Sequence, residues 1–368
     1  MKNSFGNNIT LTLFGESHGE AIGCVIDGIA PGIAVDYEAM ELALIQRRGE
    51  NDISTARREG DAVRIISGVL NGYTEGTPIC MIIENGDVRR ADYEKAGGAV
   101  RPGHADLTAE YKYHGYQDRS GGGHFSGRLT APIVAAGALV GAALRARGIY
   151  VATHLCELGG IPDREIDDIK ADAEALARAS FPVLDSAAAD KMREAIRAAR
   201  AEGDSIGGIA ECAVVGMPVG IGEPWFDTVE GMLAHAVLSC PGVKGIEFGG
   251  GFALARMRGS EANDEPYFDT DGTVRTKTNN CGGILGGITN GMPITLRAAI
   301  KPTPSIAREQ NTVNTATAEA CRVNVGGRHD AAIAHRACPV INALVSLTLA
   351  DLIATHLGTD WLARGSEI

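Results

Sequence analysis

The chain has 368 residues, of which 45% are hydrophobic and 22% charged, a composition typical of a globular protein with one large core or two medium ones. Its net charge of -12 and its 5% of aromatic residues argue against binding to nucleic acid or to a membrane surface. Glycine is frequent, with 48 residues clustered between apolar runs. Such clusters indicate tight turns and places where backbone approaches a ligand closely.

Short β-rich runs are expected at 9–14, 22–27, 63–70 and 79–84, and again at 209–215, 247–257 and 293–300. Helical apolar spacing behind an acidic start predicts helices over 36–48 and 226–238. The runs 128–147 and 339–357 are apolar nearly all round, so we expect them to be helices buried between layers. The most hydrophobic run, 129–144, is short for a membrane span and rich in alanine and glycine.

The chain repeats itself. Residues 67–79 (SGVLNGYTEGTPI) and 282–294 (GGILGGITNGMPI) are identical at seven of thirteen positions. Two further pairs follow in the same order: 21–36 with 205–224, and the run after Arg128 with the run after Arg336. We therefore predict one α+β domain over 1–368, a sandwich with pseudo-two-fold symmetry. Its internal repeats span about 1–150 and 205–360, with a polar helical insertion at about 160–204.

The cysteines and the N-terminus indicate a compartment. The eight cysteines never lie within four residues of one another, so no metal-binding spacing exists and no metal site is expected. We expect buried thiols in a reducing cytosol. The N-terminal residues lack the apolar segment of a signal peptide, which favours a cytoplasmic protein.

Residues 15–19 (GESHG) fit G-x-S-x-G, the nucleophile elbow of α/β-hydrolases. That elbow needs a helix after its serine, whereas the sequence after Gly19 indicates a second strand and a turn. We favour a turn that presents His18 to a ligand. A serine hydrolase using Ser17 and a plain glycine turn remain alternatives.

Two further loops precede expected helices. Residues 101–106 (RPGHAD) place Arg101 and His104 in a turn where Asp106 is a good N-cap, which suits either anion binding and proton transfer or a simple helix entry. Residues 121–128 (GGGHFSGR) offer free N–H groups at a helix start, which suits phosphate or flavin; a glycine-rich linker is the alternative. The second copy has GGRHD at 326–330, and KPTPS at 301–305 adds a lysine and two hydroxyls after a strand.

These segments together resemble the chorismate synthase family over essentially the whole chain. The resemblance rests on eight motifs in the family's order: FGESHG, RPGHAD, the triple-glycine loop, GDSIGG (203–208), VKGIEFG (243–249), GGILGGI (282–288), KPTPS and GRHD (327–330). It implies two related βαβ-type halves with helices packed between antiparallel sheets, usually in a homotetramer. No segment remains for a flavin reductase, so a monofunctional enzyme with an external source of reduced flavin is implied.

The resemblance implies the last step of the shikimate pathway in aromatic amino acid biosynthesis. Phosphate and a proton leave 5-enolpyruvylshikimate 3-phosphate in an anti-1,4-elimination that gives chorismate, with reduced FMN (FMNH2) required and NADP associated with the family. By the same resemblance His104 protonates the reduced flavin, His18 assists the departing phosphate, and Asp330 disposes of the C6 proton through flavin N5, with Ser17 and Ser126 as relays.

The family's binding positions map onto two sets. The flavin set is His124, Phe125, Ser126, Pro241, Gly242, Gly286, Lys301, Pro302, Thr303, Pro304, Ser305 and Arg328. The set for substrate phosphate and carboxylate consists of forked guanidinium groups, namely Arg47, Arg48, Arg57, Arg101, Arg128 and Arg328.

The chain departs from the family at three places. The loop is GGGHFSGRLTA where the family usually has GGGRSSARETA, and RHDA replaces RHDP. Asp52 stands where the family often has an arginine, in a loop one residue shorter. The altered loop makes a non-catalytic flavin- or phosphate-binding protein a further alternative, although His18, His104 and Asp330 are all present.

Overall fold

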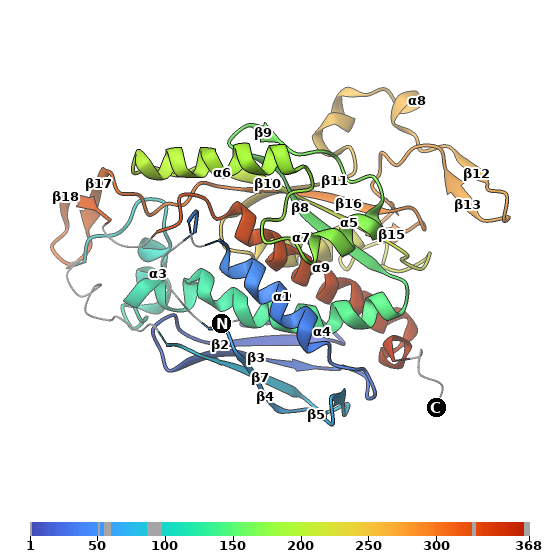
Figure 1. Ribbon diagram of the computed structural model, residues 1–368, viewed down its shortest axis with the longest axis horizontal. Helices are drawn as coiled ribbons and strands as arrows, with labels where there is room; N and C mark the ends of the chain where they lie inside the picture. The colour runs from blue at the N-terminus through green and yellow to red at the C-terminus, as the bar shows by residue number, and fades with distance from the viewer. Residues whose placement is uncertain (1, 51, 55–59, 87–97, 326–328, 364–368) are drawn as a thin grey trace.

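Two five-stranded antiparallel sheets enclose a layer of helices in the computed structural model, which describes residues 2–50, 52–54, 60–86, 98–325 and 329–363 (Figure 1). The first sheet has the order β1 (Ser4–Phe5), β2 (Thr10–Gly15), β3 (Ala21–Asp27), β7 (Ile79–Glu84) and β4 (Val63–Ser67). The second has the order β9 (Ile161–Pro162), β8 (Tyr150–Leu158), β10 (Gly208–Val215), β16 (Ile294–Ile300) and β11 (Val243–Phe248). The fold is α+β, as predicted.

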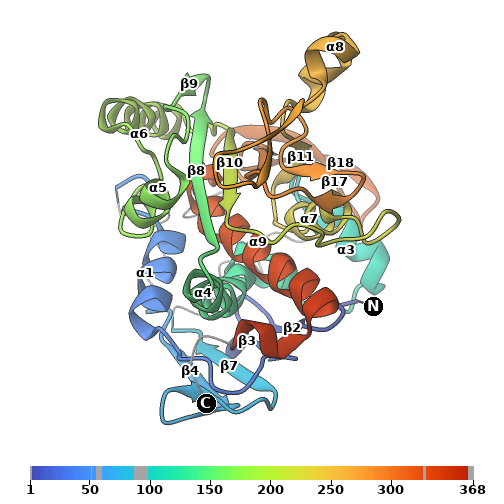
Figure 2. The ribbon, with the colours of Figure 1, turned by 90° about the vertical axis from the view of Figure 1, so that its right-hand side faces the viewer.

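The helix layer holds α1 (Tyr37–Arg48), α4 (Thr130–Ala146), α7 (Val229–Leu238) and α9 (Ala334–Leu357). Figure 2 shows α4 and α9 between the two sheets, and they pack against each other. Both are long and apolar enough to cross a membrane, but 78% and 94% of their most apolar windows are buried inside the protein. Their apolar surface is thus covered by the sheets and by each other, as expected for core helices.

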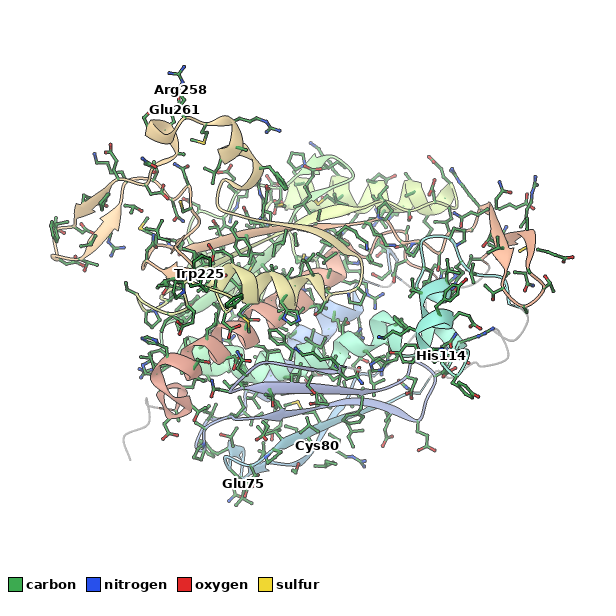
Figure 3. The ribbon with its side chains drawn as sticks, turned by 180° about the vertical axis from the view of Figure 1, so that it is seen from behind. Glu75, Cys80, His114, Trp225, Arg258 and Glu261 are labelled. Carbon is green, nitrogen blue, oxygen red and sulfur yellow. The ribbon has the colours of Figure 1, made fainter. Side chains whose placement is uncertain are left out.

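The remaining elements are short or lie outside this sandwich. Helices α5 (Ile169–Leu176) and α6 (Ser186–Ala201) form the inserted segment and pack against β8 and β9. Helix α3 (Asp106–Tyr113) precedes two 3₁₀ turns, Ser120–Phe125 and Gly127–Leu129. Helix α8 (Gly259–Ala262) projects from the second sheet with a hairpin, and Arg258 and Glu261 mark its tip in Figure 3. The hairpins are β5–β6 (Val69–Leu70, Tyr73–Thr74), β12–β13 (Pro266–Phe268, Val274–Thr276), β14–β15 (Ile284–Leu285, Ile288–Thr289) and β17–β18 (Glu309–Asn314, Glu319–Asn324); a last 3₁₀ turn spans Thr359–Leu362.

Four strands of each sheet correspond in order. The first sheet runs β2-β3-β7-β4 and the second β8-β10-β16-β11, and α1 and α7 follow β3 and β10 in the chain. The edge strands differ, since β1 precedes β2 in the chain whereas β9 follows β8. This correspondence supports the proposal of an internal duplication. On this proposal β8 belongs to the second unit, ahead of the expected start at 205. The insertion would then separate that unit's first two long strands, β8 and β10, at the point where the first unit has the short turn between β2 and β3.

Most expected elements are present, and four boundaries differ. Helix α7 begins at Val229, three residues after the expected position 226, because Phe226 has a φ of +55°. The strand expected over 247–257 is wrong beyond its first two residues: β11 begins at Val243 and ends at Phe248, because Gly249 and Gly251 adopt φ values of +53° and +50° and a 3₁₀ turn, Gly251–Arg256, follows. The run 63–70 is split into β4 and β5. Helix α9 begins five residues before the expected position 339, so that Pro339 lies inside it. All eight cysteines are free thiols, of which four are buried and four half-buried.

Candidate active site

The turn between β2 and β3 carries Ser17 and His18, both buried. The two strands pair in antiparallel register from Thr10 opposite Asp27 to Gly15 opposite Ile22. A strand rather than a helix therefore follows the serine, and the geometry of a nucleophile elbow is absent. The sequence interpretation of a strand-to-strand turn is confirmed; that this turn presents His18 to a ligand stays a prediction.

The triple-glycine loop contacts both candidate histidines. The Ser17 N–H donates to the Gly123 carbonyl (3.1 Å), which ties the loop to the β2–β3 turn. A Cβ on Gly121 would lie 2.2 Å from His18 Cε1, and a Cβ on Gly122 would lie 3.5 Å from His104 Cε1. Gly121, Gly122 and Gly123 all have positive φ (61°, 93° and 53°), so only glycine lets the backbone pass here.

Asp106 organises the second loop. Its carboxylate accepts two bonds from the Arg101 guanidinium, at 2.7 and 2.8 Å, and faces Nδ1 of His104 at 2.7 Å. Burial alone would raise the pKa of Asp106, but bonds from Arg101 and His104 outweigh it and hold that pKa far below its usual range. The expected N-cap role of Asp106 is wrong: it is the first residue of α3, and its carboxylate serves Arg101 and His104 instead. The imidazole is thereby fixed, with Nδ1 toward the carboxylate.

Two of the expected substrate arginines form a buried cluster around Asp61. Arg47 from the end of α1 and Arg128 from the loop before α4 both pair with this carboxylate, the first at 2.8 Å. Burial lowers the pKa of Arg47 to about 10 against the attraction of Asp61, so it stays charged near neutral pH. Burial opposes ionisation of Asp61 as well, but Arg47 and Arg128 hold its pKa below the usual value.

A second ion pair adjoins this cluster. Arg336 of α9 pairs with Asp330 and donates its Nε–H to the carbonyl of Arg47 (2.8 Å). Among the described residues, three guanidinium groups here face two carboxylates, which leaves a cationic surplus that suits an anion. Arg48 donates to the Gly60 carbonyl (3.4 Å) at the edge of the cluster. Arg57 and Arg328 lie outside the described residues.

A cavity of about 310 Å³ lies beside the RPGHAD loop, and Lys301, Pro302, Thr303 and Pro304 line it together with Asp204, Ser205 and Gln310. Lys301 Nζ donates to the Gly103 carbonyl (2.5 Å), and its backbone N–H donates to the Gly242 carbonyl (2.9 Å). Ser305 is buried behind it. Within the described part of the chain, Thr303 Oγ1 and Gln310 Oε1 are buried without a hydrogen-bond partner. A cation and two unsatisfied polar atoms suit a phosphorylated, polyhydroxylated cofactor such as FMN.

The other flavin candidates are dispersed. His124 Nδ1 lies 2.9 Å from the Gly15 carbonyl, and the Phe125 ring packs edge-on against Tyr113 (5.7 Å). Ser126 Oγ accepts from the Arg128 N–H and caps the 3₁₀ turn (3.2 Å). Gly286 turns the β14–β15 hairpin, which precedes β16, whereas Lys301 follows that strand. The seven extended residues of β16 span roughly 20 Å, so Gly286 and Lys301 of the same chain lie at opposite ends of this strand and do not meet. Pro241 precedes Gly242, next to Lys301.

The sequence did not reveal Asp61, Arg336 or Gln310 as site residues. Each works through a partner more than ten residues away or in a separate element: Asp61 binds Arg128, and Gln310 lines the cavity with Lys301. Asp106 was identified only as a helix cap. The sequence offered one signal for Asp61: it is a charged residue between two expected elements.

Comparison with known proteins identifies the family. The sequence profile described as Chorismate synthase matches residues 9–354. The chain belongs to the chorismate synthase family. It is 44% identical over 355 residues to the chorismate synthase of Dehalococcoides mccartyi, covering 96% of both chains, and 46% identical over 352 residues to that of Methanocella arvoryzae, covering 95% and 93%. A crystal structure of chorismate synthase has the same fold, with a TM-score of 0.75 at 24% identity, over 96% and 94% of the two chains.

His335, next to Arg336, should make stability depend on pH. Its Nε2 lies 2.9 Å from Ser54 Oγ, and burial lowers its pKa from 6.5 to about 4. Because the folded pKa lies below the unfolded value, this stabilisation is complete above pH 6.5 and is lost as pH falls toward 4. Between pH 7.5 and pH 5, the free energy of unfolding of His335→Gln should fall by roughly 2 kcal/mol less than that of the native protein. Urea unfolding at both pH values measures this, and equal pH dependence of the two proteins would contradict it.

Proposed function

We propose that the chain catalyses the anti-1,4-elimination of phosphate from 5-enolpyruvylshikimate 3-phosphate, giving chorismate, with reduced FMN bound. One observation carries the proposal. His18 and His104, from separate parts of the first unit, meet at one glycine loop that continues into Arg128 of the buried cationic cluster. Two imidazoles next to anion-binding guanidinium groups provide proton transfer and phosphate binding in one place. Reduced FMN, when bound, supplies transient electron donation to a ring that loses phosphate.

The protein's own groups then divide the work. The cluster of Arg47, Arg128 and Arg336 attracts the substrate's phosphate and carboxylate. His18, held against Gly121, donates a proton toward the departing phosphate. His104 holds a proton for the cofactor, with its Nδ1 fixed by Asp106. Asp330, paired with Arg336, takes up the proton that leaves the substrate ring.

Lys301, Thr303 and Gln310 are proposed to hold FMN in the adjoining cavity, with Pro302, Pro304 and Ser305 shaping its wall. Ser126 serves as a helix cap in the structure, and its proposed relay role would require a change of partner. The Phe125 ring packs edge-on against Tyr113, which ties the loop to the end of α3.

The proposal extends to assembly and location. Gly286 would reach a flavin only in a neighbouring copy, which supports a homo-oligomer; we propose the homotetramer that the family resemblance implies. Apolar side chains around it are exposed and suit a subunit interface, namely Trp225 (76% exposed), Phe226 (95%) and Leu285 (47%), the first of which is labelled in Figure 3. A small-molecule biosynthetic role places the protein in the cytoplasm with an external source of reduced flavin.

The deciding experiment is an anaerobic assay of 5-enolpyruvylshikimate 3-phosphate with photoreduced FMN. We expect phosphate and chorismate to appear in equal amounts only when the flavin is reduced. Equal phosphate release with oxidised FMN in air, or without flavin, would reject the proposal. FMN binding without turnover would favour the non-catalytic alternative. A fluorophosphonate probe that labels Ser17 would favour a hydrolase.

A further inference from the structure

Helix α6 of the inserted segment lies against the residues that leave α1. We call these residues the exit segment (residues 49, 50 and 52–54). Three arginines of α6, at positions 193, 197 and 200, have the i, i+4, i+7 spacing that puts them on one helix face. All three bind the exit segment. None of these three arginines belongs to the groups described in the candidate active site.

Arg193 makes the most enclosed of these contacts. Its Nε and Nη2 donate to the two oxygens of Glu50 at 2.8 and 2.9 Å, the forked arrangement that fixes a carboxylate in orientation as well as position. Both side chains are only about one-fifth exposed, at 22% and 21%. The same guanidinium lies over the Phe181 ring, 4.7 Å from its centroid, and Ser180 also donates to Glu50.

Arg197 and Arg200 complete the contact. Arg197 pairs with the Asp52 carboxylate at 2.6 Å. Arg200 donates to two backbone carbonyls, those of Asp52 (2.6 Å) and Ser54 (2.8 Å). A planar guanidinium can bind two carbonyls at once, which a lysine cannot do in the same geometry. The exit segment is thus held through both its side chains and its backbone.

The exit segment connects α6 to the catalytic groups. Ser54 Oγ bonds Nε2 of the buried His335 on α9 (2.9 Å). The next residue, Arg336, pairs with Asp330 and bonds the carbonyl of Arg47, at the end of α1. A displacement of the exit segment would therefore be transmitted to the start of α9 and to both partners of Arg336, namely Asp330 and the carbonyl of Arg47.

We propose that α6 is a positioning element for the reaction: its arginines hold the exit segment so that Arg336, Asp330 and Arg47 stay aligned. This rests on the proposed function. In this chain Asp52 acts as the partner of Arg197, at a position where the family often has an arginine. A cation at position 52 would face Arg197 and Arg200 and be repelled, so restoring the family's usual residue alone would weaken the enzyme.

The test is a charge exchange. Asp52→Arg and Arg197→Asp should each lower kcat/KM for 5-enolpyruvylshikimate 3-phosphate about three- to fivefold, because each creates like charges at an exposed pair. The double variant should recover to within about twofold of the native value. Arg193→Ala, which breaks the half-buried fork, should cost about tenfold, with Arg193→Lys intermediate. Lys191→Ala, an exposed change on the same helix, is the matched control and should be silent.

A second measurement separates this role from plain stabilisation and from the proposed function. Hydrogen exchange at the Ile53 and Ser54 amides, both bonded to the Glu50 carbonyl, should quicken in Arg193→Ala while α4 stays protected. Quicker exchange with native kcat/KM, or a double variant no better than the singles, would overturn the positioning role. If the native chain shows no turnover, the proposed function fails. Hydrogen exchange then still tests whether the arginines of α6 hold the exit segment, and unchanged exchange in Arg193→Ala would show that they do not.

Discussion

Replacing Asp61 with alanine should lower the free energy of unfolding by about 3–5 kcal/mol. The Asp61 side chain is fully buried, and the Arg47 and Arg128 side chains that it pairs with are 5% and 3% exposed. Without the carboxylate, two guanidinium groups would remain in a low-dielectric setting with like charges facing each other. The cost comes mainly from these uncompensated charges rather than from the lost attraction.

Urea unfolding of both proteins at neutral pH measures the change. The control is Glu84→Ala, whose carboxylate pairs with Arg64 at 3.9 Å with both side chains largely exposed, at 78% and 66%. We expect that change to stay within about 0.5 kcal/mol. Equal effects of the two substitutions would show that the Asp61 carboxylate does not offset the cost of burying the two arginines. Added phosphate should stabilise Asp61→Asn more than the native protein, since the cluster then carries more positive charge.

Local pattern was enough to predict much of the fold. The two-residue period of the strands, the glycine turns between them and the apolar helices gave β2, β3, β7, β10, β16 and α4 close to their observed bounds. Local pattern could not predict which residues distant in the sequence pair in the folded chain. Helix α9 begins at Ala334 because its first turn is packed in the interior, whereas Pro339 by itself suggests a helix start.

The candidate site divides in the same way. His18 and His104 were found because glycine and proline signals mark unusual backbone around them. Of the arginines proposed for substrate binding, Arg47 and Arg128 lie together, but their shared carboxylate was not predictable. Asp61 is 14 residues from Arg47 and 67 from Arg128, and only the folded chain joins them. The role of Asp106 was misjudged because a cap and an ion-pair partner are the same residue type at a helix start.

The largest expected losses of activity come from the two histidines. His18→Ala and His104→Ala should each lower turnover by about 10²-fold or more, the usual scale for a lost general acid or base. His356→Ala and His235→Ala, both on exposed helix positions, should be nearly silent. Steady-state assay with saturating reduced FMN measures all four, and similar losses across the set would show that the two buried or loop histidines have no special role.

Asp106→Asn tests how His104 is made competent. The carboxylate accepts from Nδ1–H, so it holds the tautomer whose Nε2 is an acceptor when the ring is neutral. An asparagine of the same shape can present either its oxygen or its amide N–H, so it no longer specifies that tautomer. We expect kcat to fall by at least about tenfold, up to the loss seen for His104→Ala, with KM changed less. Nitrogen-15 NMR of the labelled imidazole, at a pH high enough to deprotonate the ring in both proteins, should show a single tautomer in the native protein and a mixture in the variant. Because Asp106 also forks with Arg101, Arg101→Lys is the matched control: it weakens that fork, keeps the carboxylate, and should leave the tautomer unchanged. A native tautomer in Asp106→Asn, or the same tautomer mixture in Arg101→Lys, would show that the carboxylate does not set the ring's proton.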